Sequence, residues 1–240
     1  MSARTLLAFD AAGHGCSAAV WHDGAVLASR QEPMRRGQAE RLVPMIESVL
    51  AAAGVGHGAL DALAVTAGPG AFTGVRIGLA TARGYALALG IPAIGIGSLA
   101  AVAAGTDPTE RAGRTLLVLI DAKRADVYAQ AFGPDLRPAG DPMAVAPDDL
   151  DAALPPGGLL LAGDGDAGAA AALRAAGRDV VRADAPALVD PGVLAGLAAR
   201  QPIPPRHAAS PRPVYLRPPD VAVPSGPGPS AAANRPRRAP

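Results

Sequence analysis

Residues 5–10 read Thr-Leu-Leu-Ala-Phe-Asp, and residues 115–121 read Thr-Leu-Leu-Val-Leu-Ile-Asp. Each run is mostly apolar up to its closing aspartate, and each is followed by a polar turn and an alternating run, over residues 17–21 and 126–132. Short apolar runs bounded by turn residues predict buried strands. The same pattern therefore occurs twice, about half the length of the chain apart. This predicts that the protein consists of two structurally related halves. Chance is the alternative, because strands in α/β proteins often end at polar loops.

The remaining elements follow from turn residues and from periodicity. The Asp23-Gly24 turn between apolar runs predicts a hairpin. Apolar residues at helical spacing predict a helix over residues 38–53, which Gly54 closes. We further expect strands over residues 60–67, 93–97 and 159–162, and helices from the glycine-rich stretch to Leu89, over residues 167–176 and over residues 187–200, the last interrupted early by Pro191.

The domain organisation follows from these elements. We assign residues 1–104 to a first lobe and residues 105–217 to a second, with the helix over residues 187–200 able to pack back on the first lobe. Residues 218–240 are rich in proline and show no periodicity. Such a composition cannot bury enough apolar area to offset the entropy lost on ordering, so we predict a disordered tail.

Composition and charge exclude several classes of protein. Half of the residues are hydrophobic but only 3% are aromatic, so small aliphatic side chains must fill the core. The formal net charge is +1 with acids and bases mixed, which does not predict a direct nucleic-acid binder. Cys16 is the one cysteine, which excludes an intramolecular disulfide and favours a reducing compartment. The first apolar run is too short for a signal sequence or a membrane span, so we expect a cytoplasmic protein without a membrane partner.

Residues 68–74, Gly-Pro-Gly-Ala-Phe-Thr-Gly, join a predicted strand to a predicted helix. An anion could bind at such a helix N-terminus, and Asp10, Gly70 and Thr73 are the candidate nucleotide contacts. The stretch lacks the Gly-Lys-Ser/Thr ending of a Walker loop and the acidic residue of a dinucleotide fingerprint. We favour a tight turn with glycines at positive φ, in which Thr73 could cap the helix.

The helix that follows carries two rows of small residues. The rows are Gly74, Gly78, Ala82 and Ala86, and Ala80, Gly84 and Ala88. A row without bulky side chains lets another backbone approach closely. One row can pack on the protein's own sheet while the other packs on something outside the chain, with Arg76 and Arg83 as charged contacts at the rim of that interface.

Candidate catalytic groups are few. Asp10 and Asp121 end the two repeated strands, but neither is followed by residues suited to phosphate, so structural roles are favoured for both. The four histidines show no metal-ligand spacing, and no Gly-x-Ser-x-Gly elbow is present. We predict no catalytic residue and no metal site.

Residues 68–78 closely resemble the Gly-Pro-Gly-Ser-Phe-Thr-Gly-Leu-Arg-Ile-Gly signature of the TsaB family, also called YeaZ. Other family segments occur in the same order, at residue 10 and at residues 16–20, 42–46, 98–99, 121–124, 127–128, 163–165 and 213–217. The resemblance covers about residues 4–217. It implies the two-lobed actin/Hsp70/hexokinase-like fold (ASKHA, a duplicated RNase H-like α/β fold).

The resemblance also implies a function without independent catalysis. Family members are scaffold subunits of the complex that makes N6-threonylcarbamoyladenosine (t6A) at adenosine 37 of tRNA. They pair with the catalytic subunit TsaD and with the ATPase TsaE, form homodimers when alone, and meet tRNA only through the complex. No cofactor of its own is implied, since ATP and metal belong to the partner subunits. TsaD holds its metal with a His-x-x-x-His pair, and residues 37–41 here contain no histidine.

The resemblance places partner binding on two helices, over residues 40–53 and 74–89. The contact residues it implies are Arg41, Leu42, Met45, Ile46, Val49, Arg76, Gly78, Leu79, Ala82 and Arg83. On this basis Leu79→Glu or Ala82→Arg should abolish partner binding while leaving the monomer folded.

Two departures and two alternatives accompany this interpretation. Ala11-Ala12 stands where the family usually has Thr-Ser, and Ala71 stands for serine, which weakens any case for nucleotide binding by this chain alone. The alternatives are a small-molecule kinase of the same fold and an M22-type metallopeptidase-like protein.

Overall fold

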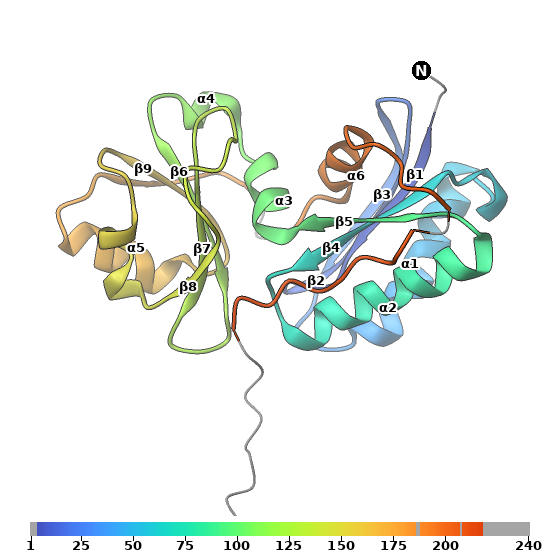
Figure 1. The fold of residues 1–240 in the computed structure, drawn as a ribbon, viewed down its shortest axis with the longest axis horizontal. Helices are drawn as coiled ribbons and strands as arrows, with labels where there is room; N and C mark the ends of the chain where they lie inside the picture. Colours follow the sequence, from blue (N-terminus) through green and yellow to red (C-terminus); the bar gives the residue numbers. More distant parts are fainter. Residues whose placement is uncertain (1–3, 186–187, 207, 218–240) are drawn as a thin grey trace, which may run out of the picture.

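The computed structural model describes residues 4–185, 188–206 and 208–217. The predicted disordered tail, residues 218–240, lies outside the described residues. Two lobes lie side by side, each built on its own sheet of five strands (Figure 1). Among the described residues, no helix combines the length and the apolar character needed to cross a membrane.

The two sheets have the same topology, which confirms the predicted duplication. The first sheet contains β1 (Thr5–Asp10), β2 (Gly15–His22), β3 (Ala25–Pro33), β4 (Ala62–Gly68) and β5 (Ala93–Gly97), in the order β3-β2-β1-β4-β5. The second contains β6 (Thr115–Asp121), β7 (Val127–Phe132), β8 (Met143–Val145), β9 (Leu159–Gly163) and β10 (Val180–Arg182), in the order β10-β9-β6-β7-β8. With β6 as the counterpart of β1, order and strand direction agree throughout. This is the expected ASKHA-like fold.

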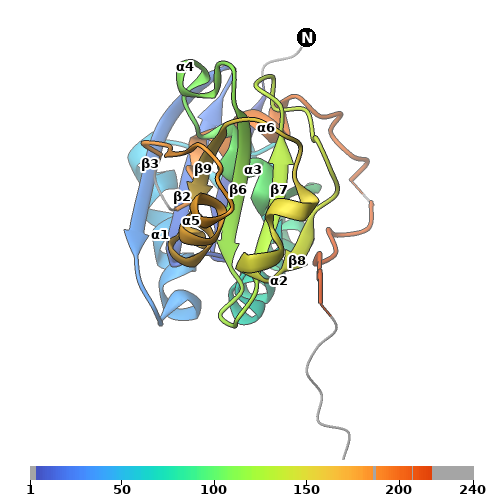
Figure 2. The ribbon, with the colours of Figure 1, turned by 90° about the vertical axis from the view of Figure 1, so that its left-hand side faces the viewer.

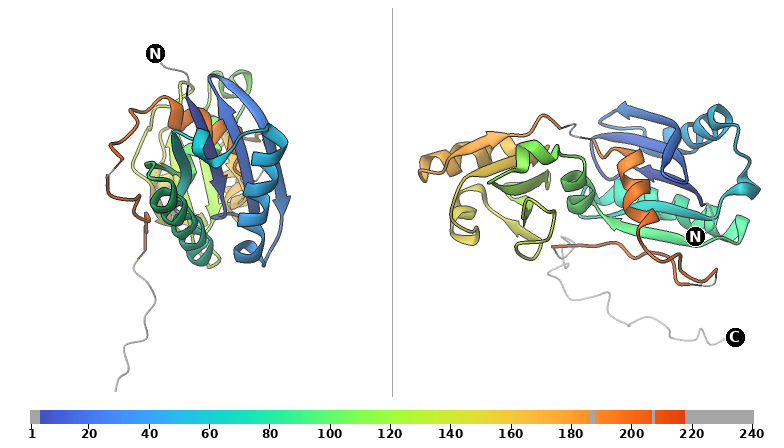
Figure 3. Two further views of the ribbon diagram at one scale, coloured as in Figure 1. Left: turned by 90° about the vertical axis from the view of Figure 1, so that its right-hand side faces the viewer. Right: turned by 90° about the horizontal axis from the view of Figure 1, so that it is seen from above.

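Helices cover both faces of the first sheet. Helices α1 (Gln38–Ala53) and α2 (Phe72–Leu89) pack side by side on one face, where they enclose side chains such as Phe9 and Val65. Helices α3 (Ser98–Ala104) and α6 (Pro191–Ala199) pack on the opposite face, although α6 comes near the end of the chain. The first lobe is therefore a three-layered structure (Figure 3).

One apolar cluster joins the two lobes. Leu6 and Ala8 of the first sheet share it with Leu116 and Val118 of the second, and the side chains of α3 and α6 lie in the same cluster. Helix α5 (Asp166–Ala175) packs on the other face of the second sheet (Figure 2). Short helical turns complete the fold at α4 (Pro108–Arg111), η1 (His57–Ala59), η2 (Pro147–Asp149) and η3 (Asp151–Ala153).

Two helix starts differ from prediction for local reasons. Helix α6 begins at Pro191, because proline suits the first helical turn and Asp190 accepts hydrogen bonds from the N–H groups of Gly192 and Val193. Pro191 thus starts the helix that it was expected to interrupt. Helix α2 begins at Phe72 with Ala71 as its cap residue, so Thr73 is not the cap.

The chain after α6 returns along the first lobe. Residues 208–217, called the strap below, run without regular structure beside α2 and end near the second lobe (Figures 1 and 3). Val214 donates its N–H to the carbonyl of Ala67 at 2.8 Å. Pro211 covers Gly95 so closely that a Cβ added to Gly95 would lie 2.7 Å from the proline ring. The strap is therefore pinned on the first sheet, which the sequence did not predict.

The start of α2 packs against the turn between β1 and β2. A Cβ added to Gly74 would lie 2.0 Å from the carbonyl oxygen of Ala11, and one added to Gly70 would lie 2.7 Å from that of Ala12. The N–H of Ala71 donates to the carbonyl of Ala12 at 2.9 Å. Glycine is required here because the two backbones are in direct contact.

We predict opposite effects from two glycine substitutions in α2. Gly74→Ala should lower the free energy of unfolding by about 1–3 kcal/mol, because the turn must move to admit a methyl group. Gly84→Ala should raise it by roughly 0.5–1 kcal/mol, since nothing lies within 4 Å of the added Cβ and alanine favours a helix. Urea unfolding of both variants measures the two values. Equal effects would contradict the close approach at Gly74.

Candidate functional site

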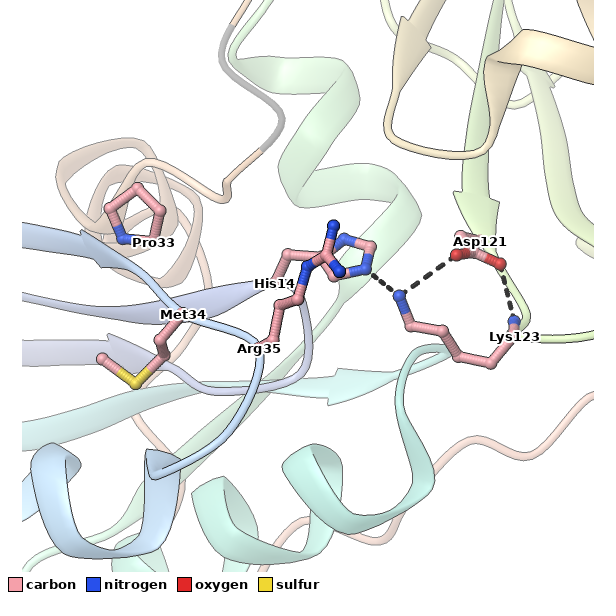
Figure 4. A pocket seen from close by; sticks show the side chains of 6 residues that line it. All are labelled: His14, Pro33, Met34, Arg35, Asp121 and Lys123. Atoms are coloured by element: carbon pink, nitrogen blue, oxygen red, sulfur yellow. Dashed lines mark hydrogen bonds and ion pairs between the residues drawn. The ribbon is translucent and has the colours of Figure 1, made fainter.

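A cavity of about 740 Å³ opens where the two lobes meet (Figure 4). The first lobe contributes His14 from the β1–β2 turn and, after the end of β3, Arg35. The second lobe contributes Asp121, which ends β6, and Lys123 from the β6–β7 turn. The turns after the two repeated strands therefore face the same space.

A chain of polar contacts crosses this cavity. His14 Nδ1 lies 2.6 Å from Asp164 Oδ2, and Lys123 Nζ contacts His14 Nε2 and lies 3.1 Å from Asp121 Oδ2. A lysine ammonium group can only donate, so Nε2 of His14 accepts and its Nδ1–H donates to Asp164. Asp164 also accepts from the N–H of Asp121 at 2.8 Å. Burial raises the pKa of the Asp164 carboxyl, while its hydrogen bond with Asp121 and the charge of Lys123 oppose that shift. These polar contacts connect the first lobe to the second.

Asp10 lies outside the residues that line this cavity. Its side chain is buried, and Oδ1 accepts hydrogen bonds from the Thr66 hydroxyl and from the N–H of Ala12 at 3.0 Å. Burial raises the pKa of Asp10, and these hydrogen bonds partly counter the shift. The carboxyl group therefore fixes the β1–β2 turn against β4.

The three candidate nucleotide contacts lie in different environments. Asp10 is buried beneath the β1–β2 turn, and Gly70 packs against the backbone of Ala12. Thr73 is exposed on the first turn of α2. A shared nucleotide site formed by these three residues therefore stays a prediction.

Cys16 is the chain's only thiol. It is buried in β2, where its Sγ donates to the carbonyl of Gln38 at 3.8 Å. Burial, with a contribution from the charge of Asp10, raises the pKa of the thiol to about 11. A thiol held protonated is a poor nucleophile. In the described part of the chain, no group of three or more His, Cys, Asp or Glu side chains is placed to hold a metal ion.

Most of the predicted partner-binding residues are buried in the first lobe itself. These residues are Leu42, Met45, Ile46, Val49, Gly78, Leu79 and Ala82. They form the inner faces of α1 and α2, so a partner cannot reach them in the folded monomer. Leu79→Glu and Ala82→Arg should therefore unfold the first lobe, which corrects the expectation that the monomer would stay folded.

The three predicted arginines lie at the surface. Arg41 forms a two-pronged ion pair with Glu32 at 2.5 Å, which lowers the pKa of Glu32 to about 2. Arg76 and Arg83 are exposed on α2. Arg76 also donates to the hydroxyl of Tyr215 at 3.0 Å.

The outer sides of α1 and α2 form an exposed, mostly small and apolar surface, which we call the docking face. It consists of Val43, Pro44, Ser48, Ala51 and Ala52 on α1, and Ala80, Gly84, Leu87 and Ala88 on α2. The exposed charged residues Glu47 of α1 and Arg83 of α2 lie beside them on the same helix sides. The second small-residue row thus faces outward, whereas the first lies against the sheet. Leu87 is 84% exposed. Tyr85 and His57 both bond to Glu47 of α1, at 2.5 and 3.0 Å, and so tie α2 and η1 to α1.

Comparisons with known proteins find relatives in sequence and in fold. The sequence model of the TsaD family, described as tRNA N6-adenosine threonylcarbamoyltransferase, matches residues 30–175. The Escherichia coli K12 protein described as tRNA threonylcarbamoyladenosine biosynthesis protein TsaB is 41% identical over 51% of this chain and 52% of its own. The chain thus spans about half the length of that curated relative.

Two solved structures from Pseudomonas aeruginosa match over more of the chain. One is described as YeaZ, with 32% identity and a TM-score of 0.72. The other is described as an uncharacterized protein with similarity to peptidase YeaZ, with 33% identity and a TM-score of 0.73. Each match covers 89% of this chain and 100% of the solved chain.

We predict that Asp10 contributes stability. Asp10→Ala leaves the Thr66 hydroxyl and the Ala12 N–H without their buried acceptor, and should lower the free energy of unfolding by about 2–3 kcal/mol. Thr66→Val should cost about 1–2 kcal/mol, since it removes one of the same hydrogen bonds. The double variant should cost less than the sum, because both changes remove a shared contact. Chemical unfolding of the four proteins tests this, and full additivity would contradict it.

Proposed function

The chain belongs to the TsaB (YeaZ) family, and on that premise we propose that it acts in the biosynthesis of threonylcarbamoyladenosine in tRNA. In this proposal it is a subunit that carries out no chemistry alone. A TsaD-like subunit supplies the transferase site with its ATP and metal, and a TsaE-like ATPase joins the pair. The complex as a whole takes up tRNA.

The observation that carries the proposal is the docking face. The face exposes the apolar side chains of Val43 and Leu87 on two adjacent helices, and exposed apolar side chains grouped on one surface mark an interaction site. Because Ala80, Gly84 and Ala88 carry little or no side chain, a partner helix can approach at the short end of the usual interhelical distance of about 8–10 Å. Close approach maximises dispersion contacts between the helices.

A related partner fits this face. Residues 30–175, which match the TsaD family model, include both α1 and α2. A TsaD-like subunit is therefore expected to carry an equivalent pair of helices, and two pairs can pack together about an approximate twofold axis. A second copy of this chain could use the same face, which accounts for a homodimer when the partner is absent.

The interior of the molecule supports a role without independent catalysis. Asp10, which would have to reach the cleft in a kinase of this fold, instead holds the β1–β2 turn. The cavity side chains His14, Lys123 and Asp121 are engaged with one another or with Asp164. Neither a kinase nor a metallopeptidase function gains support from these contacts.

Reconstitution tests the proposal directly. Purified chain, a TsaD-like subunit and a TsaE-like ATPase would be combined with unmodified tRNA, threonylcarbamoyl donor and ATP, and the modified nucleoside measured. We expect no product from the chain alone and a large loss of product when the chain is omitted. Strong transferase activity from the chain alone, or full activity without it, would overturn the proposal.

We predict that one charge on the docking face prevents assembly. Ala80→Glu places a carboxylate in a contact that the partner would desolvate, and should weaken the affinity for the TsaD-like subunit by about 100-fold. The matched control is Ala171→Glu, at an exposed alanine of α5 in the other lobe, which should leave affinity unchanged. Calorimetric titration measures both, with circular dichroism to check folding. Undiminished binding by Ala80→Glu would place the interface elsewhere.

A further inference from the structure

We propose that the edge where α2, the strap and the β6–β7 turn meet binds an unpaired segment of RNA, with base stacking on two exposed rings and phosphates held by surrounding basic side chains. This inference rests on the proposed function, because that function brings RNA to the complex. It goes further by assigning part of the RNA contact to this chain itself.

The first step is a fixed pair of aromatic rings. The hydrogen bond between Val214 and Ala67 holds the strap so that the Tyr215 ring packs on Phe72, with centroids 5.5 Å apart and planes tilted by 32°. The Arg76 guanidinium lies 3.7 Å from the Phe72 centroid, and its Nε donates to the Tyr215 hydroxyl. The three side chains hold one another in place.

These rings remain partly exposed to solvent. Phe72 is 45% exposed and Tyr215 is 42% exposed. Phenylalanine and tyrosine are scarce in this chain, with three of each in 240 residues, so two at one surface point are unusual for it. Exposed rings held in a fixed orientation are what single-stranded nucleic acids use as stacking platforms, because every base has a flat apolar face.

The second step is the charge around the rings. Arg217 pairs with Asp126, which places the end of the strap at the β6–β7 turn. That turn also carries Lys123 and Arg124, and Lys123 lines the interlobe cavity together with Arg35. We call Arg35, Arg76, Lys123, Arg124 and Arg217 the basic edge.

The balance of charge at this edge favours a polyanion. Five basic side chains stand here with three nearby acidic ones, Asp121, Asp126 and Asp164, in a chain whose formal net charge is only +1. Lys123 and Arg217 form ion pairs with Asp121 and Asp126, and the positive charges still outnumber the negative ones. Such an excess attracts phosphates, and each phosphate bound releases counterions from the RNA. The even overall charge, which predicted no direct nucleic-acid contact, conceals this local concentration.

A protein partner is the competing occupant, because tyrosine and arginine are also common in protein interfaces. RNA is favoured because the edge combines excess positive charge with stacking surfaces. The apolar face suited to a protein is the docking face, on the outer sides of α1 and α2. Arg76, one helical turn before Ala80, stands where the two surfaces meet.

The experiment uses the complex with the TsaD-like subunit, after size-exclusion chromatography has shown that each variant assembles. A fluorescein-labelled RNA hairpin with an unpaired loop would be titrated, and the fully paired duplex of the same stem would serve as the control ligand. Phe72→Leu and Tyr215→Leu should each weaken hairpin binding by roughly 10-fold, because they remove a ring but keep an apolar side chain. Tyr215→Phe keeps the ring and loses only the hydrogen bond from Arg76, so it should retain most of the affinity that Tyr215→Leu loses. Duplex binding should change little in all three variants.

The basic edge is tested through salt dependence. Arg35→Ala should reduce the slope of log affinity against log salt by about one, as expected for one lost phosphate contact. The matched control is Arg137→Ala, whose exposed arginine lies beyond the opposite end of β7 from the β6–β7 turn. The control should leave both the slope and the affinity unchanged.

Each possible result is informative. If the complex does not assemble, the proposed function fails, and titration of the chain alone with the hairpin still tests this inference. The inference is overturned if the complex assembles but both ring substitutions leave hairpin affinity unchanged. It is also overturned if Arg137→Ala has the same effect as Arg35→Ala, or if the ring substitutions weaken assembly with the partner and not RNA binding.

Discussion

The contact between two backbones at the start of α2 determines much of the first lobe. Gly70 and Gly74 let the β1–β2 turn lie directly against the helix, and the buried Asp10 fixes that turn from the other side. This packing presses the inner row of small residues onto the sheet and so leaves the outer row exposed. The same contact therefore also orients the docking face.

Periodicity predicted those elements whose environment is determined locally. The repeated strands, the hairpin at Asp23-Gly24 and helix α1 all carry a strong pattern of apolar residues, and the structure has them within a few residues of their predicted bounds. The two rows of small residues in α2 did not by themselves reveal which row faces inward. In the structure, Val75 and Leu79 are buried beside the inner row, and Gly74 contacts Ala11, which lies far away in the sequence.

The strap and the interlobe contacts were missed for the same reason. Residues 208–217 have no periodicity, since each contact of the strap is made with a different distant element, Pro211 with Gly95 and Arg217 with Asp126 among them. The link between His14 and Asp164 likewise joins residues from different lobes. Chain order gives little information about such pairs. The repeat in the sequence did contain a usable signal. When two related lobes pack together, the equivalent turns after β1 and β6 face each other, and this predicts that they line one cavity.

A docking face made of small residues reconciles two opposing demands. A face rich in leucine would bind a partner strongly but would expose a large apolar patch whenever the partner is absent. Alanine and glycine expose less apolar area in the free chain, and they regain binding energy through the close approach of helix backbones. Such a face is selective, because it binds tightly only to a partner whose own helices can approach equally closely. The arginines beside it add charge at the rim, where it remains hydrated and costs little on binding. In the proposed complex, Arg76 would then stand between the partner and the RNA, so that a single side chain borders both surfaces.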